Sequence, residues 1–401
     1  MNILMFCSNP VNGGTARMFY ELATAFSLLL PEEDKLYACV NRENPVEIYK
    51  KVKDLHRLPI FSAEELFAKL YGGNVFERIV KGIARRIKYE NTKRNNVSVM
   101  EKFIVEKSID AVIIHNGGYL GDDLCNQMLT AAYRCADFVP YRIFVLHNDM
   151  EKNRLSKLRF KNYDKRISRE ATDIVTVSNY TKKRMMESSY IKKDIAVIYN
   201  GITVKFRMTD EEKMEKIHYR KECPNILMIG NFARNKGQKM FMEAANELLQ
   251  NSLNIHFTII GNVYDKAYFD ECMHYLYEQK MEKDFSIYHG INNAYEYISL
   301  FDMLVVPTLY DESFGLISVE AMASSRPVVA FACGGVPEVV QDMRDGLVVP
   351  VGDTHKMAEA IKWLMNHPEE CERMGKNGRT DYEVKFSVEV MAKQYLNMLR
   401  K

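Results

Sequence analysis

Short apolar runs rich in β-branched residues alternate with longer stretches of helical periodicity from one end of the chain to the other. Many of these runs lack polar alternation, as strands buried on both faces of a parallel sheet do. The first half contains such runs at residues 2–7, 35–40, 111–115, 142–147, 174–178 and 196–199. The second half contains them at residues 225–230, 256–260, 286–289, 303–307, 328–331 and 346–349.

This order of elements predicts the fold class. Strands that alternate with helices indicate parallel sheets joined by right-handed crossovers. Two sets of six strands predict an α/β chain of two Rossmann-like domains that face each other across a cleft. We place the first domain at residues 1–202, because residues 203–216 are polar without strong periodicity and the strand pattern then restarts. The second domain covers residues 203–384, and a last helix in residues 385–401 belongs to it or crosses back to the first domain.

Composition narrows the class of protein. At 401 residues the chain is long enough for two domains, and its 47% hydrophobic and 27% charged residues are typical of a soluble globular protein. The net charge of +2 argues against a polyanion-binding molecule. No apolar run reaches the roughly 18 residues of a membrane span, and the first residues predict a strand rather than a signal peptide. The eight cysteines are scattered without a Cys-x-x-Cys pair, which favours a reduced, cytoplasmic protein.

The segment from Asp311 to Glu320 carries the most specific chemistry. Glu312 and Glu320 bracket a Phe-Gly-Leu turn between a buried strand and a helix, where α/β proteins present backbone N–H groups to anionic ligands. Eight helical residues would separate the two acids by roughly 12 Å, whereas a glycosidase acid pair lies about 5–9.5 Å apart. The spacing therefore favours two acids that contact two parts of one long ligand. The alternative is a solvated loop followed by a helix-surface glutamate.

Two glycine-containing loops follow other strands. Gly13 and Gly14 come after the first strand and precede a helix, so their backbone can approach a ligand or simply form a tight turn. The second loop, Gly-Asn-Phe-Ala-Arg-Asn-Lys-Gly at residues 230–237, also opens a helix. Its Arg234 and Lys236 are placed to neutralise a diphosphate, unless they belong to a solvated basic turn.

His115 and His147 end two strands of the first half and are expected at the cleft edge of the sheet. A histidine there can donate a hydrogen bond to a sugar hydroxyl or balance charge on a reacting diphosphate, and the alternative is a structural histidine. A Cys-Gly-Gly-Val-Pro-Glu turn at residues 333–338 brings its backbone near a ligand or only makes the turn. No Asp-x-Asp occurs, so there is no obvious carboxylate clamp for a metal-bound diphosphate. Phosphate charge would be met by Arg234, Lys236 and helix dipoles.

Basic residues concentrate in residues 78–94 and 152–169. An amphipathic basic helix can lie on an anionic membrane surface, and the alternative is a solvated helix face. We expect no nucleic-acid partner, because no recognition module is visible and the basic runs lack an aromatic stacking pattern.

Taken together, these residues resemble the retaining glycosyltransferases of family 4, the glycosyl transferases group 1, which have the GT-B fold. The resemblance spans nearly the whole chain and includes the Glu-x7-Glu signature from Glu312 to Glu320. It is strongest in three segments and extends to two others: Pro-Thr-Leu-Tyr-Asp-Glu-Ser-Phe-Gly-Leu-Ile-Ser-Val-Glu-Ala-Met-Ala at 307–323, Arg-Pro-Val-Val-Ala at 326–330, Gly-Gly-Val-Pro-Glu at 334–338, Val-Ser at 177–178 and Tyr-Asn-Gly-Ile at 199–202.

The resemblance implies a role for each matching residue. Glu320 would bind the ribose hydroxyls, and Glu312 with the backbone of Phe314, Gly315 and Leu316 would hold the donor sugar. Ile291, after His289 and Gly290, would flank the base.

The remaining implied roles concern the diphosphate and the acceptor side. Gly14, Arg234 and Lys236 would hold the diphosphate, and His147 would act as the catalytic histidine near the donor sugar and acceptor. The family usually has arginine directly after the first glycine of the second loop; this chain has Asn231, and we expect Arg234 to substitute. The implied mechanism uses no metal and no cofactor, and the leaving phosphate itself deprotonates the acceptor.

The predicted protein is a retaining, metal-independent glycosyltransferase that moves a hexose or N-acetylhexosamine from a nucleoside diphosphate sugar, with a UDP-sugar favoured, to a hydroxyl of a sugar or lipid-linked acceptor. The first domain would be the acceptor side and the second the donor side. Surface polysaccharide or glycolipid synthesis at the inner face of the cell membrane is the expected setting. Two alternatives stay open, a nucleotide-sugar epimerase of similar architecture and a non-catalytic sugar-nucleotide-binding protein.

Overall fold

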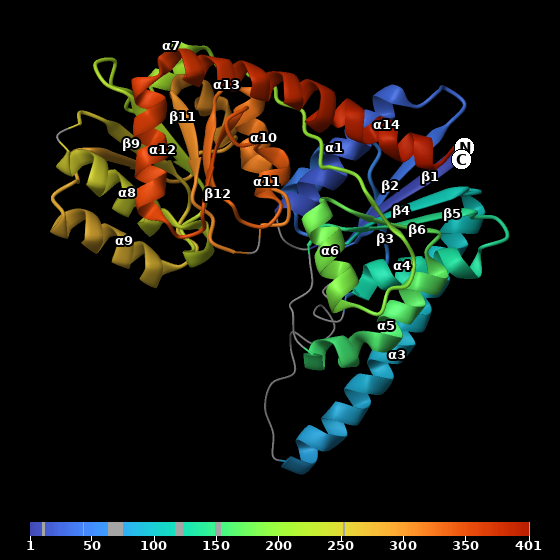
Figure 1. Ribbon diagram of the computed structural model, residues 1–401. Coiled ribbons are helices and arrows are strands. Elements are labelled where there is room, and N and C mark those ends of the chain that lie inside the picture. Colours follow the sequence, from blue (N-terminus) through green and yellow to red (C-terminus); the bar gives the residue numbers. More distant parts are fainter. Residues whose placement is uncertain are drawn as a thin grey trace. The chain divides into compact units, whose positions relative to one another are not determined.

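The computed structural model describes residues 1–9, 13–42, 44–62, 75–116, 123–148, 154–251, 253–310 and 312–400. The chain divides into two compact units (Figure 1). The first is formed by Met1–Gly201 with Met391–Lys401, and the second by Ile202–Val390. Each unit contains one parallel sheet with helices packed against it.

The first unit has a seven-stranded sheet in the order β3-β2-β1-β4-β5-β6-β7. Its strands are β1 (Asn2–Cys7), β2 (Lys35–Asn41), β3 (His56–Leu58), β4 (Ala111–Asn116), β5 (Tyr141–Leu146), β6 (Asp173–Thr176) and β7 (Ile195–Val197). Its helices are α1 (Gly14–Leu29), the 3-10 helix η1 (Glu47–Lys51), α3 (Val75–Glu106), α4 (Asp123–Arg134), α5 (Arg154–Glu170) and α6 (Asn179–Ser188).

The central strands β1 and β4 are buried almost from end to end, which explains their unbroken apolar runs. The expectation of six strands in this half was wrong, because β3 adds a seventh at the edge of the sheet. Its three residues, His-Arg-Leu, pair only with β2 and bury a single side chain fully. Such a strand leaves no apolar run in the sequence.

The second unit has a six-stranded sheet in the order β10-β9-β8-β11-β12-β13. Its strands are β8 (Asn225–Ile229), β9 (His256–Ile260), β10 (Phe285–Tyr288), β11 (Met303–Val306), β12 (Val328–Phe331) and β13 (Gly346–Val349). Its helices are α7 (Asp210–Met214), η2 (Arg234–Lys236), α8 (Gln238–Gln250), α9 (Lys266–Glu278), η3 (Ala294–Leu300), α10 (Leu316–Ala323), α11 (Val336–Val339), α12 (Thr354–Asn366), α13 (Pro368–Asp381) and the π-helical turn η4 (Tyr382–Phe386).

The last helix, α14 (Val388–Met398), begins in the second unit and continues into the first from Met391. Among the described helices, none combines the length and the apolar character that a membrane-crossing helix needs.

The strand order creates one switch point in each sheet. In the first unit β1 pairs with both β2 and β4, so the chain adds β2 on one side of β1 and later adds β4 on the other side. In the second unit β8 has β9 on one side and β11 on the other. Ligands of open α/β sheets bind at the carboxyl ends of the strands at such points. In the second unit, a ligand site is therefore expected at the loops after β8 and β11.

Candidate functional site

The loops after β8 and β11 are joined along their backbones. The Leu309 N–H donates to the Asn235 carbonyl at 2.9 Å. Gly237 has φ +76°, and a Cβ at this position would lie 2.0 Å from the Pro307 carbonyl oxygen. Only glycine combines this left-handed conformation with this close approach. The two loops form the switch-point site, residues 230–237 and 307–316, of which 311 lies outside the described residues.

Lys236 and Glu312 meet within the switch-point site. The Lys236 Nζ donates to Glu312 Oε2 at 3.0 Å, although 76 positions separate the two residues in the chain. Their side chains are 35% and 18% exposed, so the pair is reachable by a ligand. An ion pair with this exposure contributes at most about 1 kcal/mol to stability. Its main consequence is that it fixes an ammonium group and a carboxylate side by side at the sheet edge.

A third loop holds the backbone of Glu312. The Gly335 N–H donates to the Glu312 carbonyl at 2.9 Å. A Cβ on Gly334, whose φ is +57°, would lie 1.9 Å from the same oxygen. The two glycines after Cys333 therefore pack against the Glu312 carbonyl and fix the backbone of Glu312. Sequence reasoning left open whether these glycines approach a ligand or form a turn, and it missed this supporting contact.

Helix α10 starts at the switch-point site. Gly315, at φ +100°, is its N-cap, and Leu316 is its first residue. The Phe314 ring is 2% exposed and lies edge-on to Phe386 at 5.9 Å, so the side chain anchors the turn while the backbone stays at the helix start. The backbone N–H groups at a helix N-terminus favour anions. Glu320 lies farther along the same helix, 5% exposed.

Arg234 is held away from this pair. Its guanidinium makes an ion pair with Glu271 Oε2 on α9 at 2.9 Å and lies over the Tyr268 ring at 5.2 Å. Lys239 shares Glu271 at 2.7 Å. The hydrogen bond with Glu271 raises the pKa of Arg234, and the hydrogen bonds from Lys239 and Arg234 lower that of Glu271. Arg234 is still 56% exposed. Sequence reasoning missed Glu271, which no local pattern marks as a partner.

Asn231 stands where the family usually has arginine, and it ties neighbouring loops together. Its Oδ1 accepts from the Asn262 N–H at 3.1 Å, and Asn262 Oδ1 accepts from the Gly290 N–H at 2.7 Å. These residues, together with Ile291, line a small cavity of about 100 Å³ at the carboxyl ends of β8, β9 and β10. Ile291 therefore lines a cavity that adjoins the switch-point site and can enclose part of a ligand bound there.

In the first unit, His115 and His147 form a buried pair at the carboxyl ends of β4 and β5. His115 Nδ1 and His147 Nε2 are 3.0 Å apart, and the rings are stacked with 19° between their planes. Burial lowers the pKa of His147 to about 4 and that of His115 well below its usual value, so both rings are neutral at neutral pH. Gly14 is exposed as the first residue of α1, after β1; residues 10–12 of the connecting turn lie outside the described residues.

The predicted residues thus divide between the units. The second unit brings Lys236, Glu312 and the α10 residues Leu316 and Glu320 onto the switch-point loops and their helix, beside Phe314 and Gly315. It places Arg234 on Glu271 and Ile291 on a neighbouring cavity. The first unit holds Gly14 and His147. Of the two basic segments, the side chains of residues 78–85, 152–157 and 159 lie outside the described residues.

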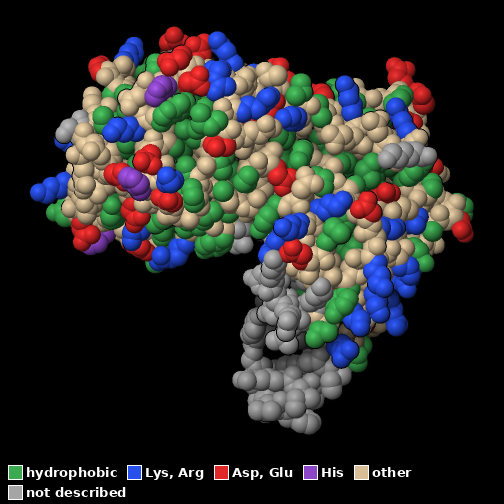
Figure 2. Space-filling model, in the orientation of Figure 1, with side chains coloured by type: hydrophobic (Ala, Val, Ile, Leu, Met, Phe, Trp, Pro, Cys, Tyr) green, Lys and Arg blue, Asp and Glu red, His purple; other side chains and the backbone are tan. Residues whose placement is uncertain are grey.

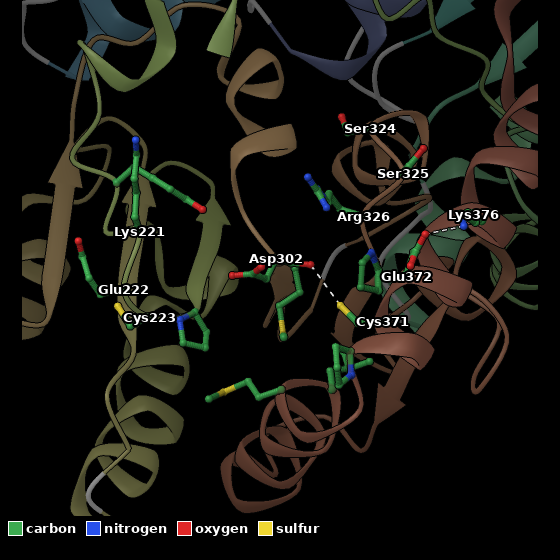
Figure 3. Close-up of a pocket in the computed structure, with 17 residues that line it drawn as sticks. Lys221, Glu222, Cys223, Asp302, Ser324, Ser325, Arg326, Cys371, Glu372 and Lys376 are labelled. Atoms are coloured by element: carbon green, nitrogen blue, oxygen red, sulfur yellow. Dashed lines mark hydrogen bonds and ion pairs between the residues drawn. The ribbon is translucent and has the colours of Figure 1, made fainter. Parts of the chain in front are cut away.

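A larger cavity of about 770 Å³ lies at the opposite edge of the second sheet (Figure 3). It is lined by residues just before strands, among them Pro224, Asp302 and Pro327, and by Arg326 and Cys371. None of the predicted site residues lines it. In the described part of the chain, no group of three or more His, Cys, Asp or Glu side chains is arranged to hold a metal ion.

Comparison with known proteins agrees with this geometry. Residues 63–206 match the family model Glycosyltransferase Family 4, and residues 209–381 match Glycosyl transferases group 1. The capsular polysaccharide biosynthesis glycosyltransferase CapM of Staphylococcus aureus is 26% identical over 235 residues, which are 57% of this chain and 61% of CapM. The chain spans about half to three fifths of the length of the curated relatives that it matches.

Two solved structures show the same fold. A glycosyltransferase from Rickettsia africae ESF-5 superposes with a TM-score of 0.79 at 17% identity, covering 100% of this chain and 97% of that one. Anabaena HepE in complex with UDP gives 0.76 at 13% identity, covering 100% of both chains. The two parallel-sheet units thus have the GT-B fold, as expected. The chain belongs to the group 1, family 4-like glycosyltransferases, which confirms the resemblance inferred from the Glu312–Glu320 motif.

Proposed function

We propose that this protein transfers a hexose or N-acetylhexosamine from a nucleoside diphosphate sugar, with a UDP-sugar favoured, to a hydroxyl of a sugar or lipid-linked acceptor. The observation that carries the proposal is the Lys236–Glu312 pair at the switch point of the second sheet, beside the start of α10. One cation, one carboxylate and a row of helix N–H groups match the alternating charge and hydroxyls of a sugar diphosphate.

The donor is proposed to lie along the carboxyl edge of the second sheet. Lys236 and the backbone from Phe314 to Leu316 hold the diphosphate and sugar, and Glu312 accepts from a sugar hydroxyl. Glu320 accepts from the ribose hydroxyls, and the base enters the cavity beside Ile291. The UDP bound by HepE supports this choice of ligand class.

The transfer is proposed to proceed with retention and without a metal. The acceptor oxygen forms its bond to the anomeric carbon on the face from which the diphosphate oxygen leaves, and the acceptor proton passes to that leaving oxygen. Lys236 and the α10 dipole stabilise the charge that develops on the diphosphate. His147, which is neutral at the carboxyl edge of the first sheet, is proposed to bind the acceptor by a hydrogen bond.

A thermal-shift screen against UDP-, GDP- and ADP-sugars tests the donor site. A ligand at 100 times its Kd stabilises the native state by about 2.7 kcal/mol, so the true donor class should raise the melting temperature clearly. Lys236→Met should lose most of this shift, because it removes the cation at the switch point. Arg234→Met should lose less, because Glu271 already neutralises Arg234.

Three outcomes would contradict the proposal. No nucleotide sugar raises the melting temperature, or both variants respond like the wild type, or binding occurs without release of nucleoside diphosphate in the presence of acceptors. The last result would favour a non-catalytic binding protein. Conversion of the donor to an epimer without acceptor would instead favour the epimerase.

We further propose that the acceptor pathway is surface polysaccharide or glycolipid synthesis, which the name of CapM supports. On helices α3 and α5 of the first unit, Ile87 is 59% and Leu158 is 62% exposed. Lys and Arg side chains (blue) gather beside hydrophobic ones (green) at the lower right of Figure 2. Apolar side chains among cations suit an anionic membrane surface. Co-sedimentation with vesicles of anionic lipid should fall in an Arg86→Glu, Lys88→Glu double variant, and unchanged binding would contradict the membrane contact.

A further inference from the structure

The buried histidine pair of the first unit contains a residue that the proposed function leaves unused. His115 lies within β4 and His147 follows β5, and the His147 N–H donates to the Asn116 carbonyl at 3.3 Å. The two residues are 1% and 6% exposed. The rings are held together as a hydrogen-bonded pair, because both are buried and His115 Nδ1 lies 3.0 Å from His147 Nε2.

Each neutral imidazole carries one N–H, so one ring donates and the other accepts. Two arrangements are available. If His147 donates from Nε2, then His115 must carry its own proton on Nε2. If His115 donates from Nδ1, then His147 must carry its proton on Nδ1.

The surroundings of His115 distinguish the two arrangements. His115 Nε2 is buried without a hydrogen-bond partner among the described residues. Its ring lies against Phe19 at 5.8 Å and Tyr395 at 6.5 Å. Buried N–H groups without an acceptor are rarer in proteins than acceptors without a donor. The arrangement with the proton on His115 Nδ1 leaves only a lone pair in this apolar position.

The second ring nitrogen of His147 has different surroundings. Its Nε2 is engaged with His115, and His147 Nδ1 makes no hydrogen bond in the described part of the chain. Nδ1 is therefore the ring nitrogen of His147 that remains for a ligand.

We propose that His115 is a positioning residue: it donates its Nδ1–H to His147 Nε2 and thereby fixes His147 with its proton on Nδ1, as a hydrogen-bond donor rather than a proton acceptor. This inference rests on the proposed function, because it assigns the role of His147 in the transfer. The group that His147 Nδ1 binds is an oxygen lone pair, such as that of a sugar hydroxyl or phosphate. His147 then takes no proton from the acceptor.

Nitrogen-15 NMR of histidine-labelled protein without ligand tests the tautomer directly, because protonated and unprotonated ring nitrogens resonate far apart. We expect His147 protonated on Nδ1 in the wild type and a mixture of tautomers in His115→Leu. Protonation of His147 on Nε2 in the wild type would overturn the proposal. This readout does not depend on activity, so a failure of the proposed transfer reaction is distinguishable from a failure of the tautomer assignment.

Kinetics provide the second test. His115→Leu should lower kcat roughly 10- to 100-fold with little change in the donor KM, the pattern of a lost orienting partner. His115→Asn should keep most of the activity, since its amide nitrogen stands on Cγ as Nδ1 does. His147→Asn should likewise keep more activity than His147→Gln, because the amide of glutamine lies one carbon farther from the backbone.

The buried His256, whose Nε2 lies 3.0 Å from Ser286 Oγ in the second unit, offers a matched control. His256→Leu removes a buried imidazole without touching the pair and should leave kcat near the wild-type value. Equal loss of kcat in His115→Leu and His115→Asn, or unchanged kcat in His115→Leu, would contradict the positioning role. If His115→Leu does not fold, the nitrogen-15 spectrum of the wild type and the kcat of His115→Asn still test the positioning role.

Discussion

Glu312→Gln is expected to lower the rate of sugar transfer roughly 100- to 1000-fold, the usual effect of removing one preorganised electrostatic contact. The amide cannot balance the Lys236 ammonium group, which the carboxylate holds at 3.0 Å. It also replaces an acceptor of a sugar hydroxyl by a group with half the accepting capacity. The measurement is the acceptor-dependent release of nucleoside diphosphate, with kcat and KM separated.

A second lysine–glutamate pair in the same unit provides the control. Lys356 and Glu359 are each 55% exposed and 3.5 Å apart on α12. Glu359→Gln should leave both the transfer rate and the melting temperature almost unchanged, because exposed pairs contribute little. Full transfer activity in Glu312→Gln would show that this carboxylate is not part of the reacting site.

Gly334→Ala is expected to have the largest effect on stability. Its Cβ would lie 1.9 Å from the Glu312 carbonyl oxygen, at a φ of +57° that side chains rarely adopt. Backbone strain and overpacking together should lower the free energy of unfolding by roughly 2–6 kcal/mol. Because the displaced atom belongs to Glu312, transfer should also fall. Denaturant unfolding followed by circular dichroism measures the first effect, and nucleoside diphosphate release measures the second.

Gly352 separates strain from contact. Its φ is +80°, but a Cβ there would meet nothing within 4 Å. Gly352→Ala should therefore lose only the roughly 1–2 kcal/mol of the left-handed conformation and keep its activity. If Gly334→Ala lowers the free energy of unfolding no more than Gly352→Ala does, the close contact with the Glu312 carbonyl does not contribute to the loss of stability.

The arrangement at Arg234 shows how a local sequence pattern can miss a partner. The sequence placed Arg234 and Lys236 in one basic turn, two residues apart, and gave both the same expected role. In the folded unit Lys236 meets Glu312 after β11, whereas Arg234 meets Glu271 on α9. Side chains two residues apart in a loop point to different neighbours, and those neighbours come from elements distant in the chain.

The sequence by itself determined the parallel α/β class and nearly all of the strands, because buried parallel strands must be continuous apolar runs. It also determined the family, through the Glu312–Glu320 motif, and the placing of His115 and His147 at strand ends. It did not reveal β3, whose three residues carry no apolar run.

Only the tertiary structure decided what these elements do together. The order of strands in a sheet depends on the packing of whole crossovers, and that order places β11 beside β8. This pairing joins Lys236 to Glu312, and the pairing of β11 with β12 places Gly334 against the Glu312 carbonyl. In the first sheet, β4 beside β5 turns two separate histidines into one bonded pair. Such contacts depend on distances between residues far apart in the chain, which no local pattern encodes.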